Sequence, residues 1–210
     1  MASSPSLDLF LSAVASRISC YALTKHSPIP DSEIHSIVQF AINHTPSTFN
    51  VQSARAVVLL HAEHEKLWDI GDASLRVALP EQAYQSLAPK VLGFKAGYGT
   101  VLWFEDEEAM DKLKEKSAGI QHLMDDWSLH SSGMHQFVVW TALELKGLGC
   151  NLQHYNFMPD FSTQVAREWK LPDSWKLQSQ LVFGAPKDGH LVRSRERTYL
   201  PLEERVKIFV

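Results

Sequence analysis

The sequence predicts an α+β fold of three layers, in which helices flank a mixed central sheet. Apolar residues recur at helical spacing over most of the chain, while four or five shorter runs have the composition of strands. No repeat, low-complexity tract or long linker interrupts the 210 residues. We therefore expect a single domain over residues 1–210, large enough to bury most of its apolar surface.

The first quarter of the chain predicts two helices and a buried strand. One helix covers residues 7–17, and a second begins at Asp31, a favourable N-cap residue, and ends before Pro46. Residues 47–52 form a polar loop. The aliphatic run 56–60 is short and unbroken, which is typical of a strand buried on both faces. The polar loop is therefore expected to present its side chains at an edge of the sheet.

Two helices, a strand and a third helix follow. Helical patterns cover residues 63–77 and 81–92, and residues 98–104 have the pattern of a second strand. Residues 105–106 are acidic and are expected to cap a charged helix that ends near residue 116.

The C-terminal half is dominated by one apolar helix. Residues 133–148 are apolar nearly all round, which indicates a helix buried in the middle of the fold. The polar stretch 121–136 before it predicts either a pocket lining or a surface loop. A further helix covers residues 159–171, and strands are expected at 176–183 and, at the end of the chain, at 205–210.

Composition and charge exclude several classes of function. Twenty basic and 24 acidic residues give a net charge of −4, so the chain has no positive field for a nucleic acid. The longest apolar segment, 137–148, is too short to cross a membrane and contains Glu144 and Lys146, so no membrane partner is expected. Two cysteines, Cys20 and Cys150, fit a reducing compartment. We expect a cytoplasmic protein, with a nuclear location left open.

Common nucleotide and metal signatures are missing from the sequence. It contains no P-loop and no dinucleotide-binding glycine fingerprint. His61 and His64 lie on either side of Glu63, but their spacing supplies no third ligand, so no metal is expected. A histidine-based metal protein remains a third interpretation, which metal analysis of the purified chain would test.

Three polar clusters point to a ligand more strongly together than singly. Residues 17–19 place an arginine two positions before a serine, a pairing that suits a phosphate. In the segment 46–52, the amides of Asn50 and Gln52 each offer a donor and an acceptor. Arginines alternate in 193–197 and share one side if this segment is extended. Each cluster alone could equally be a helix end, a polar turn or a solvated basic run.

The clusters and four further segments together resemble the nitroreductase family of FMN-dependent oxidoreductases. The further segments, at residues 127–137, 140–144, 147–156 and 201–207, are similar to the small branch typified by the fatty acid repression mutant proteins. The block 147–156 is the most specific of them. One departure from the family pattern is Ser16, which stands where most members have a second arginine.

The resemblance implies which residues meet the flavin. Its cofactor contacts would be Arg17, Ile18, Ser19, Asn50, Gln52, Leu152, Gln153, His154, Arg195 and Arg197. Arg17, Ser19 and either Arg195 or Arg197 would bind the phosphate, while Asn50 and Gln52 would reach the pyrimidine edge and ribityl chain. The main chain at 152–154 would lie near the flavin N5. Substrate-side contacts would come from His130, His135 and Tyr155.

The resemblance also implies an activity and an assembly. NADH or NADPH would donate a hydride, a nitroaromatic or quinone-type oxidant would accept it in a ping-pong cycle, and no catalytic side chain would be needed. The family forms homodimers, in which the strand at residues 205–210 would be exchanged between subunits. An alternative from another class is a catalytically weak flavin-binding protein that regulates lipid or redox signalling.

Overall fold

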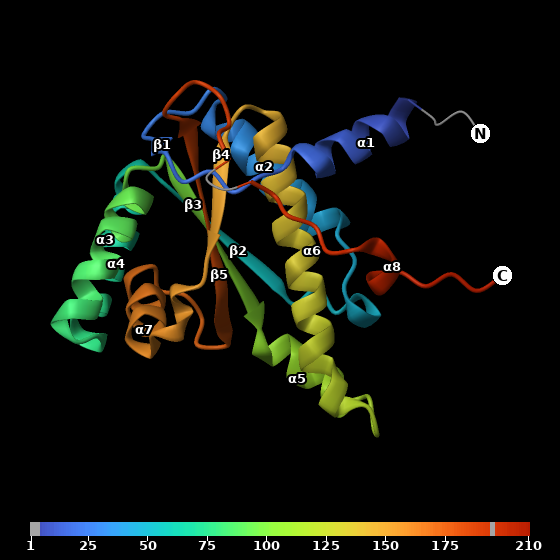
Figure 1. The fold of residues 1–210 in the computed structure, drawn as a ribbon. Coiled ribbons are helices and arrows are strands. Elements are labelled where there is room, and N and C mark those ends of the chain that lie inside the picture. The colour runs from blue at the N-terminus through green and yellow to red at the C-terminus, as the bar shows by residue number, and fades with distance from the viewer. Residues whose placement is uncertain (1–4, 194–195) are drawn as a thin grey trace.

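The computed structural model describes residues 5–193 and 196–210 and forms a sheet between two layers of helices (Figure 1). The strands are β1 (Leu23–Thr24), β2 (Ala54–Leu60), β3 (Gly99–Asp106), β4 (Gly149–Gln153) and β5 (Trp175–Pro186). The helices are α1 (Pro5–Ser16), α2 (Asp31–His44), α3 (His61–Ala78), α4 (Glu81–Lys95), α5 (Glu107–Glu115), α6 (Met124–Leu145), α7 (Pro159–Glu168) and α8 (Leu202–Arg205). Single 3₁₀ turns lie at Thr48–Asn50, Gln121–Leu123 and Tyr155–Phe157.

The sheet is antiparallel in every pairing of the described strands, which corrects the expected mixed sheet. Strand β3 lies between β2 and β5, and both β1 and β4 pair with β5. Helices α3 and α4 connect β2 to β3 and return the chain to the end at which β2 stopped, where Leu60 faces Gly99. Strand β3 therefore runs back along β2 instead of parallel to it.

The central strand β3 is buried on both faces, which confirms the three layers. Leu102 and Phe104 belong to a core shared with α3, α4 and α7. Val101 and Trp103 point to the other face and belong to a core shared with α2 and α6. This alternation follows from the two-residue period of a strand, and it means that each helical layer packs on its own side of one sheet.

Two predicted caps behave differently in the structure. Asp106 caps α5 as expected, because its carboxylate accepts a hydrogen bond from the Glu108 N–H at 3.2 Å. Asp31 is the first residue of α2 and does not cap it, since its carboxylate binds the side chains of Tyr98 and His61 instead. Glu105 also does not cap α5, because it is a buried residue of β3.

Helix α6 differs from its prediction at both ends. It begins at Met124, so most of the polar stretch 121–136 is helical and is not a loop. It is also not buried all round, because Phe137 and Leu145 on its outer side are exposed. Small and polar residues face inward at several positions of the first half, and this hid the helical period in the sequence.

The other predicted helices and strands are present except at the short strands and the end of the chain, but β2 is a mostly half-buried edge strand and not a strand buried on both faces. The structure adds β1 and β4, which were not predicted. The expected strand 205–210 is wrong for the single chain, since Arg205 ends α8 and residues 206–210 have no regular structure. A strand needs a neighbouring strand for its backbone hydrogen bonds, and this segment pairs with none of the described strands of its own chain. Among the described helices, none is long and apolar enough to cross a membrane.

Candidate cofactor site

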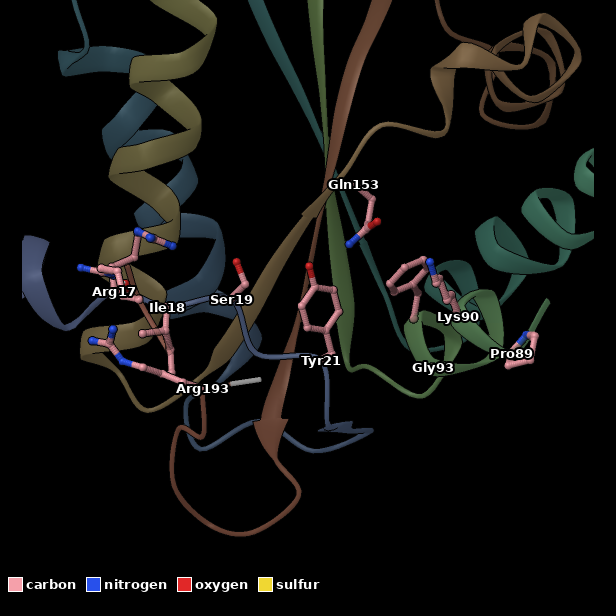
Figure 2. Close-up of a pocket in the computed structure, with 11 residues that line it drawn as sticks. Arg17, Ile18, Ser19, Tyr21, Pro89, Lys90, Gly93, Gln153 and Arg193 are labelled. Carbon is pink, nitrogen blue, oxygen red and sulfur yellow. The ribbon is translucent and has the colours of Figure 1, made fainter. Parts of the chain in front are cut away.

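A cavity of about 790 Å³ opens between the turn after α1, helix α4, the end of β4 and the segment after β5. Its lining residues are Arg17, Ile18, Ser19, Tyr21, Pro89, Lys90, Gly93, Phe94, Gln153, Arg193 and Arg197. Figure 2 shows Arg17 and Arg193 on one side, Lys90 on the other, and Gln153 between them. Four of the lining residues are cationic and none of the described ones is acidic, so the cavity attracts an anion.

Arg17 is the first candidate for an anion contact. Its guanidinium lies over the ring of Trp140 from α6, with the central carbon 4.3 Å from the ring centroid. Its Nη1 atom is buried and has no hydrogen-bond partner among the described residues. A buried guanidinium nitrogen without an acceptor is costly, and a phosphate oxygen would supply that acceptor. The site therefore fits a phosphate-bearing ligand.

Glu144 holds the turn that carries Arg17. It is a buried residue of α6, and its Oε2 accepts a hydrogen bond from the Ile18 N–H at 3.0 Å. Its Oε1 accepts one from the indole N–H of Trp140 at 2.8 Å. Burial raises the pKa of Glu144, while these two bonds and the charges of Arg17 and Arg197 act against that rise.

The C-terminal segment closes one side of the cavity. Arg197 donates hydrogen bonds to the carbonyl oxygens of Ala15 at 3.3 Å and Arg17 at 2.5 Å, so it links this segment to the end of α1. Arg193 also lines the cavity, although it was not among the expected cofactor contacts. The expected contact Arg195 lies outside the described residues.

Strand β4 presents an amide to the cavity. The Gln153 side chain donates a hydrogen bond to Asn151 Oδ1 at 2.8 Å, and Asn151 in turn donates to the Cys20 carbonyl at 2.9 Å. This chain of amides fixes Gln153 against the segment that follows Ser19. Leu152 packs in the core on the other face of the sheet, and His154 is exposed just beyond the strand. The main chain of β4 therefore borders the cavity at Gln153.

Helix α4 supplies a wall that sequence reasoning missed. Pro89 and Gly93 lie one turn apart in this helix and both line the cavity. A Cβ atom at Gly93 would meet no atom within 4 Å, so the packing of the protein itself does not require glycine there. Glycine inside a helix is unfavourable by about 1 kcal/mol relative to alanine. Proline and glycine inside one helical pattern were the signal in the sequence that could have drawn attention to this helix.

The second polar cluster does not reach this cavity. Asn50 and Gln52 have left-handed backbone conformations, with φ of 55° and 52°, in the loop between α2 and β2. The Gln52 N–H donates to Ser47 Oγ at 2.9 Å, which stabilises the tight loop. Phe49 in the same loop lies 6.3 Å from the ring of Trp127 on α6. The loop therefore packs on α6, and neither amide is a lining residue.

The expected substrate contacts do not line the cavity either. His135 is buried, with Nδ1 2.7 Å from the Ser131 carbonyl oxygen. The Tyr155 ring packs against Trp68 and Phe94 in the core, and burial raises the pKa of Tyr155 to about 12. In the single chain both side chains are enclosed by the protein, so neither faces this cavity. His130 instead lies in a separate apolar groove between α1, α2 and α6.

The histidine pair considered for a metal has structural contacts. His64 is fully buried, with Nδ1 2.9 Å from Thr100 Oγ1 and Nε2 3.1 Å from the Phe94 carbonyl oxygen. His61 lies beside Asp31 and Tyr98 at the surface. Within the described residues, no group of three or more potential ligands could hold a metal ion.

The described residues therefore form a cationic cavity that contains an amide and lies beside the sheet of an α+β sandwich. Residues 14–185 match the model of the Nitroreductase family, and the chain belongs to this family of oxidoreductases.

The relatives place the chain in the small branch of the family. It is 33% identical to HBN1 from Saccharomyces cerevisiae over 202 residues, which cover 95% of this chain and 96% of HBN1. It is 32% identical to the nitroreductase FRM2 of the same yeast over 179 residues, which cover 84% of this chain and 88% of FRM2. FRM2 is a fatty acid repression mutant protein, so these relatives confirm the branch.

Solved structures agree with the assignment. The nitroreductase CinD from Lactococcus lactis, in complex with nicotinic acid, has a TM-score of 0.85 and 35% identity and covers 96% of this chain and 100% of CinD. CinD has also been solved with chloramphenicol and with 4-nitrophenol. A nitroreductase from Desulfitobacterium hafniense with bound FMN shares the fold at 16% identity and a TM-score of 0.65, covering 95% of this chain and 97% of its own.

Proposed function

We propose that the chain is an FMN-dependent oxidoreductase that uses NADH or NADPH to reduce nitroaromatic or quinone-type acceptors. Arg17 carries the proposal because it lines a cationic cavity of a nitroreductase-family chain and its buried Nη1 has no acceptor among the described residues. Nicotinic acid and 4-nitrophenol are the molecules found in CinD. The first resembles the nicotinamide of the proposed donor, and the second is a nitroaromatic like the proposed acceptors.

Arg17, Ser19, Arg193 and Arg197, which line the end of the cavity beside α1, would hold the phosphate. The Arg17 guanidinium would donate to the phosphate, since its Nη1 has no other partner among the described residues. The Gln153 side chain and the adjoining main chain of β4 would contact the ring system, and Gly93 of α4 would border it. These contacts orient the ligand, so no side chain has to act as acid or base.

When bound, FMN supplies a ring that accepts a hydride and passes it on, in a ping-pong cycle with one open face. The lining residues would bind this ring and keep cationic charge beside it. Arg17, Arg193 and Arg197 on one side and Lys90 on the other favour negative charge on whatever lies between them. A reduced flavin is more negative than an oxidised one, so this field favours reduction.

The homodimer belongs to the same proposal. Asn50 and Gln52 lie outside the cavity of their own chain, so their contact with a flavin has to be made in the cavity of the second subunit. An apolar groove of about 750 Å³ lies between α1, α2 and α6, on the side of the molecule away from α3, α4 and α7 (Figure 1). Phe10 and Phe40, which line this groove, are 60% and 59% exposed. A second copy would cover them.

The C-terminal segment fits the same dimer. Val206, Ile208 and Val210 alternate along residues 206–210 and are exposed. Strand β2 pairs only with β3 among the described strands, so its other edge is free. A cavity of about 760 Å³ lies along this edge beside α2. Exchange of the C-terminal segment onto β2 of the partner would supply the strand neighbour that the segment lacks.

Titration of the purified chain with FMN, followed by anaerobic addition of NADH or NADPH, tests the proposal. We expect the protein to quench flavin fluorescence up to one FMN per chain, and the nucleotide to bleach the flavin absorbance. An oxidant such as 4-nitrophenol or a quinone should then restore the absorbance. Flavin fluorescence that the protein does not change would contradict the proposal.

The same titration separates the enzyme from the regulatory alternative. Bound FMN that neither NADH nor NADPH reduces would favour a flavin-binding regulatory protein that keeps the fold without turnover. Sedimentation of the flavin-loaded protein, and of a chain truncated after Leu202, tests the dimer. We expect a dimer for the full chain and a monomer without FMN for the truncated one.

A further inference from the structure

Glu144 is the buried acid nearest the proposed phosphate site, yet it touches no cationic side chain through a hydrogen bond or ion pair among the described residues. Its two oxygens are used separately, Oε2 by the Ile18 N–H and Oε1 by the Trp140 indole N–H. A carboxylate that sits near arginines but accepts from neutral N–H groups leaves those arginines free for another anion.

The turn 17–19 depends on contacts from outside itself, because α1 has ended and no strand has begun. Arg197 fixes its beginning through the carbonyls of Ala15 and Arg17. The Cys20 N–H, just after the turn, donates to the Cys150 carbonyl of β4 at 2.8 Å. Between these two ends, Glu144 holds the N–H of Ile18. This bond determines how far the turn lies from α6.

Trp140 adds a second constraint on Arg17. Its ring lies under the guanidinium at 4.3 Å, and its orientation is held by the bond from its indole N–H to Glu144. Trp140 and Glu144 are one helical turn apart on α6, so both groups come from the same rigid element. One carboxylate therefore sets the main chain beside Arg17 and the ring beneath its guanidinium.

We propose that Glu144 is a positioning residue for the phosphate of the flavin: it acts through Ile18 and Trp140 to hold the Arg17 guanidinium at the wall of the cavity. The proposal rests on the proposed function, since it assumes a phosphate at Arg17. It assigns Glu144 no contact with the ligand. Its effect is therefore limited to ligands that carry the phosphate.

The substitution Glu144→Gln separates this role from general support of the fold. Glutamine has the same size, but its amide offers one acceptor oxygen and an NH₂ group that cannot accept. One of the two N–H donors therefore loses its partner. We expect the Kd for FMN to rise about 10-fold, the scale of a lost hydrogen bond to a charged group, and the Kd for riboflavin, which lacks the phosphate, to change less than about 2-fold.

A double-mutant cycle with Arg17→Met tests whether Glu144 acts through Arg17. We expect Glu144→Gln to weaken FMN binding by less than about 2-fold when Arg17→Met is already present. The matched control is Asp160→Asn, which alters a carboxylate that joins α7 to Ser74 of α3 outside the cavity. Its FMN and riboflavin affinities should both stay at the wild-type values, and thermal unfolding of each apoprotein verifies folding.

Three outcomes would overturn the inference. Equal losses for FMN and riboflavin would show that Glu144 only supports the cavity as a whole. Unchanged FMN affinity would show that the turn does not need it, and a full effect in the Arg17→Met background would show that it does not act through Arg17. If the wild type binds neither flavin, the proposed function fails as well, so the wild-type titration distinguishes the two failures.

Discussion

The two helical layers of the molecule differ in how completely the chain covers them. In the layer of α3, α4 and α7, Trp68, Leu75 and Phe161 are fully buried against the sheet. In the layer of α1, α2 and α6, the inner residues are equally buried, but Phe10 and Phe40 on the outside face solvent. Both layers expose single apolar residues, such as Leu92 on α4, but only in the second do they gather in an apolar groove among the described residues. The cofactor cavity reaches from one layer to the other, with α4 on one side and the turn after α1 on the other.

The largest expected effect is a loss of stability from a substitution in the core beneath α3, α4 and α7. Trp68→Ala removes a fully buried ring that packs on Phe94 and Tyr155 and whose indole N–H donates to Thr100 Oγ1 at 3.2 Å. We expect the free energy of unfolding to fall by about 3–5 kcal/mol, measured by urea denaturation of the apoprotein. A loss below about 1 kcal/mol would show that this layer is looser than its packing indicates.

The second effect is a pH dependence in the same layer. Burial lowers the pKa of His64 to about 4, because the protonated ring would lose its water in the core. Unfolded His64 binds a proton near its ordinary pKa of about 6.5, so the unfolded state gains protons first as the pH falls. The contribution of His64 to the free energy of unfolding is complete above about pH 6.5 and is lost as the pH falls from there to about 4. It amounts to about 3 kcal/mol.

Unfolding free energies at pH 7 and pH 5, for the wild type and for His64→Gln, measure this effect. The wild type should lose more stability between the two pH values than the variant does. Equal losses would contradict the assignment of the pH dependence to His64.

The third effect lies where the two layers meet at the cavity. Arg17→Ala removes the guanidinium whose Nη1 has no acceptor among the described residues, so we expect FMN binding to weaken by about 1.5–3 kcal/mol. Unfolding of the apoprotein should change far less, because the residue is partly exposed and its guanidinium contacts mainly the ring of Trp140. Isothermal titration with FMN measures it, and an unchanged affinity would refute the role of Arg17.

The smallest expected effect is on the dimer and comes from a substitution in the apolar groove beside α1, α2 and α6. Phe40→Ser removes an exposed ring from the groove, so the unfolding of a single chain should change by less than about 0.5 kcal/mol. The dimer should weaken by about 1–2 kcal/mol, which is roughly a 5- to 30-fold rise in the dimer Kd. Sedimentation velocity over a dilution series measures it. Leu92→Ser, an exposed apolar position on α4 outside the groove, is the matched control and should leave the dimer unchanged.

The sequence by itself determined the elements whose side chains repeat a local period. Helix α2 and strand β3 follow from such periods, and the arginine and serine of the turn 17–19 follow from their chemistry. The short strand β4 left no such signal, because it has only five residues and two of them, Asn151 and Gln153, are polar. Helix α6 was half hidden for a related reason, since Ser128 and Ser131 face inward where apolar residues were sought.

Only the tertiary structure decided which of the predicted polar residues meet. It brings Arg17, Arg197 and Gln153 to one cavity although more than a hundred residues separate the first from the others. It also buries Tyr155 and His135, and it separates Asn50 from the cavity of its own chain. Periodicity describes neighbours along the chain, whereas a site is made by contacts between distant segments. Glu144 shows this most clearly. The sequence alone does not indicate a role for a glutamate in an apolar helix, whereas the structure shows that it accepts hydrogen bonds from Ile18 and Trp140.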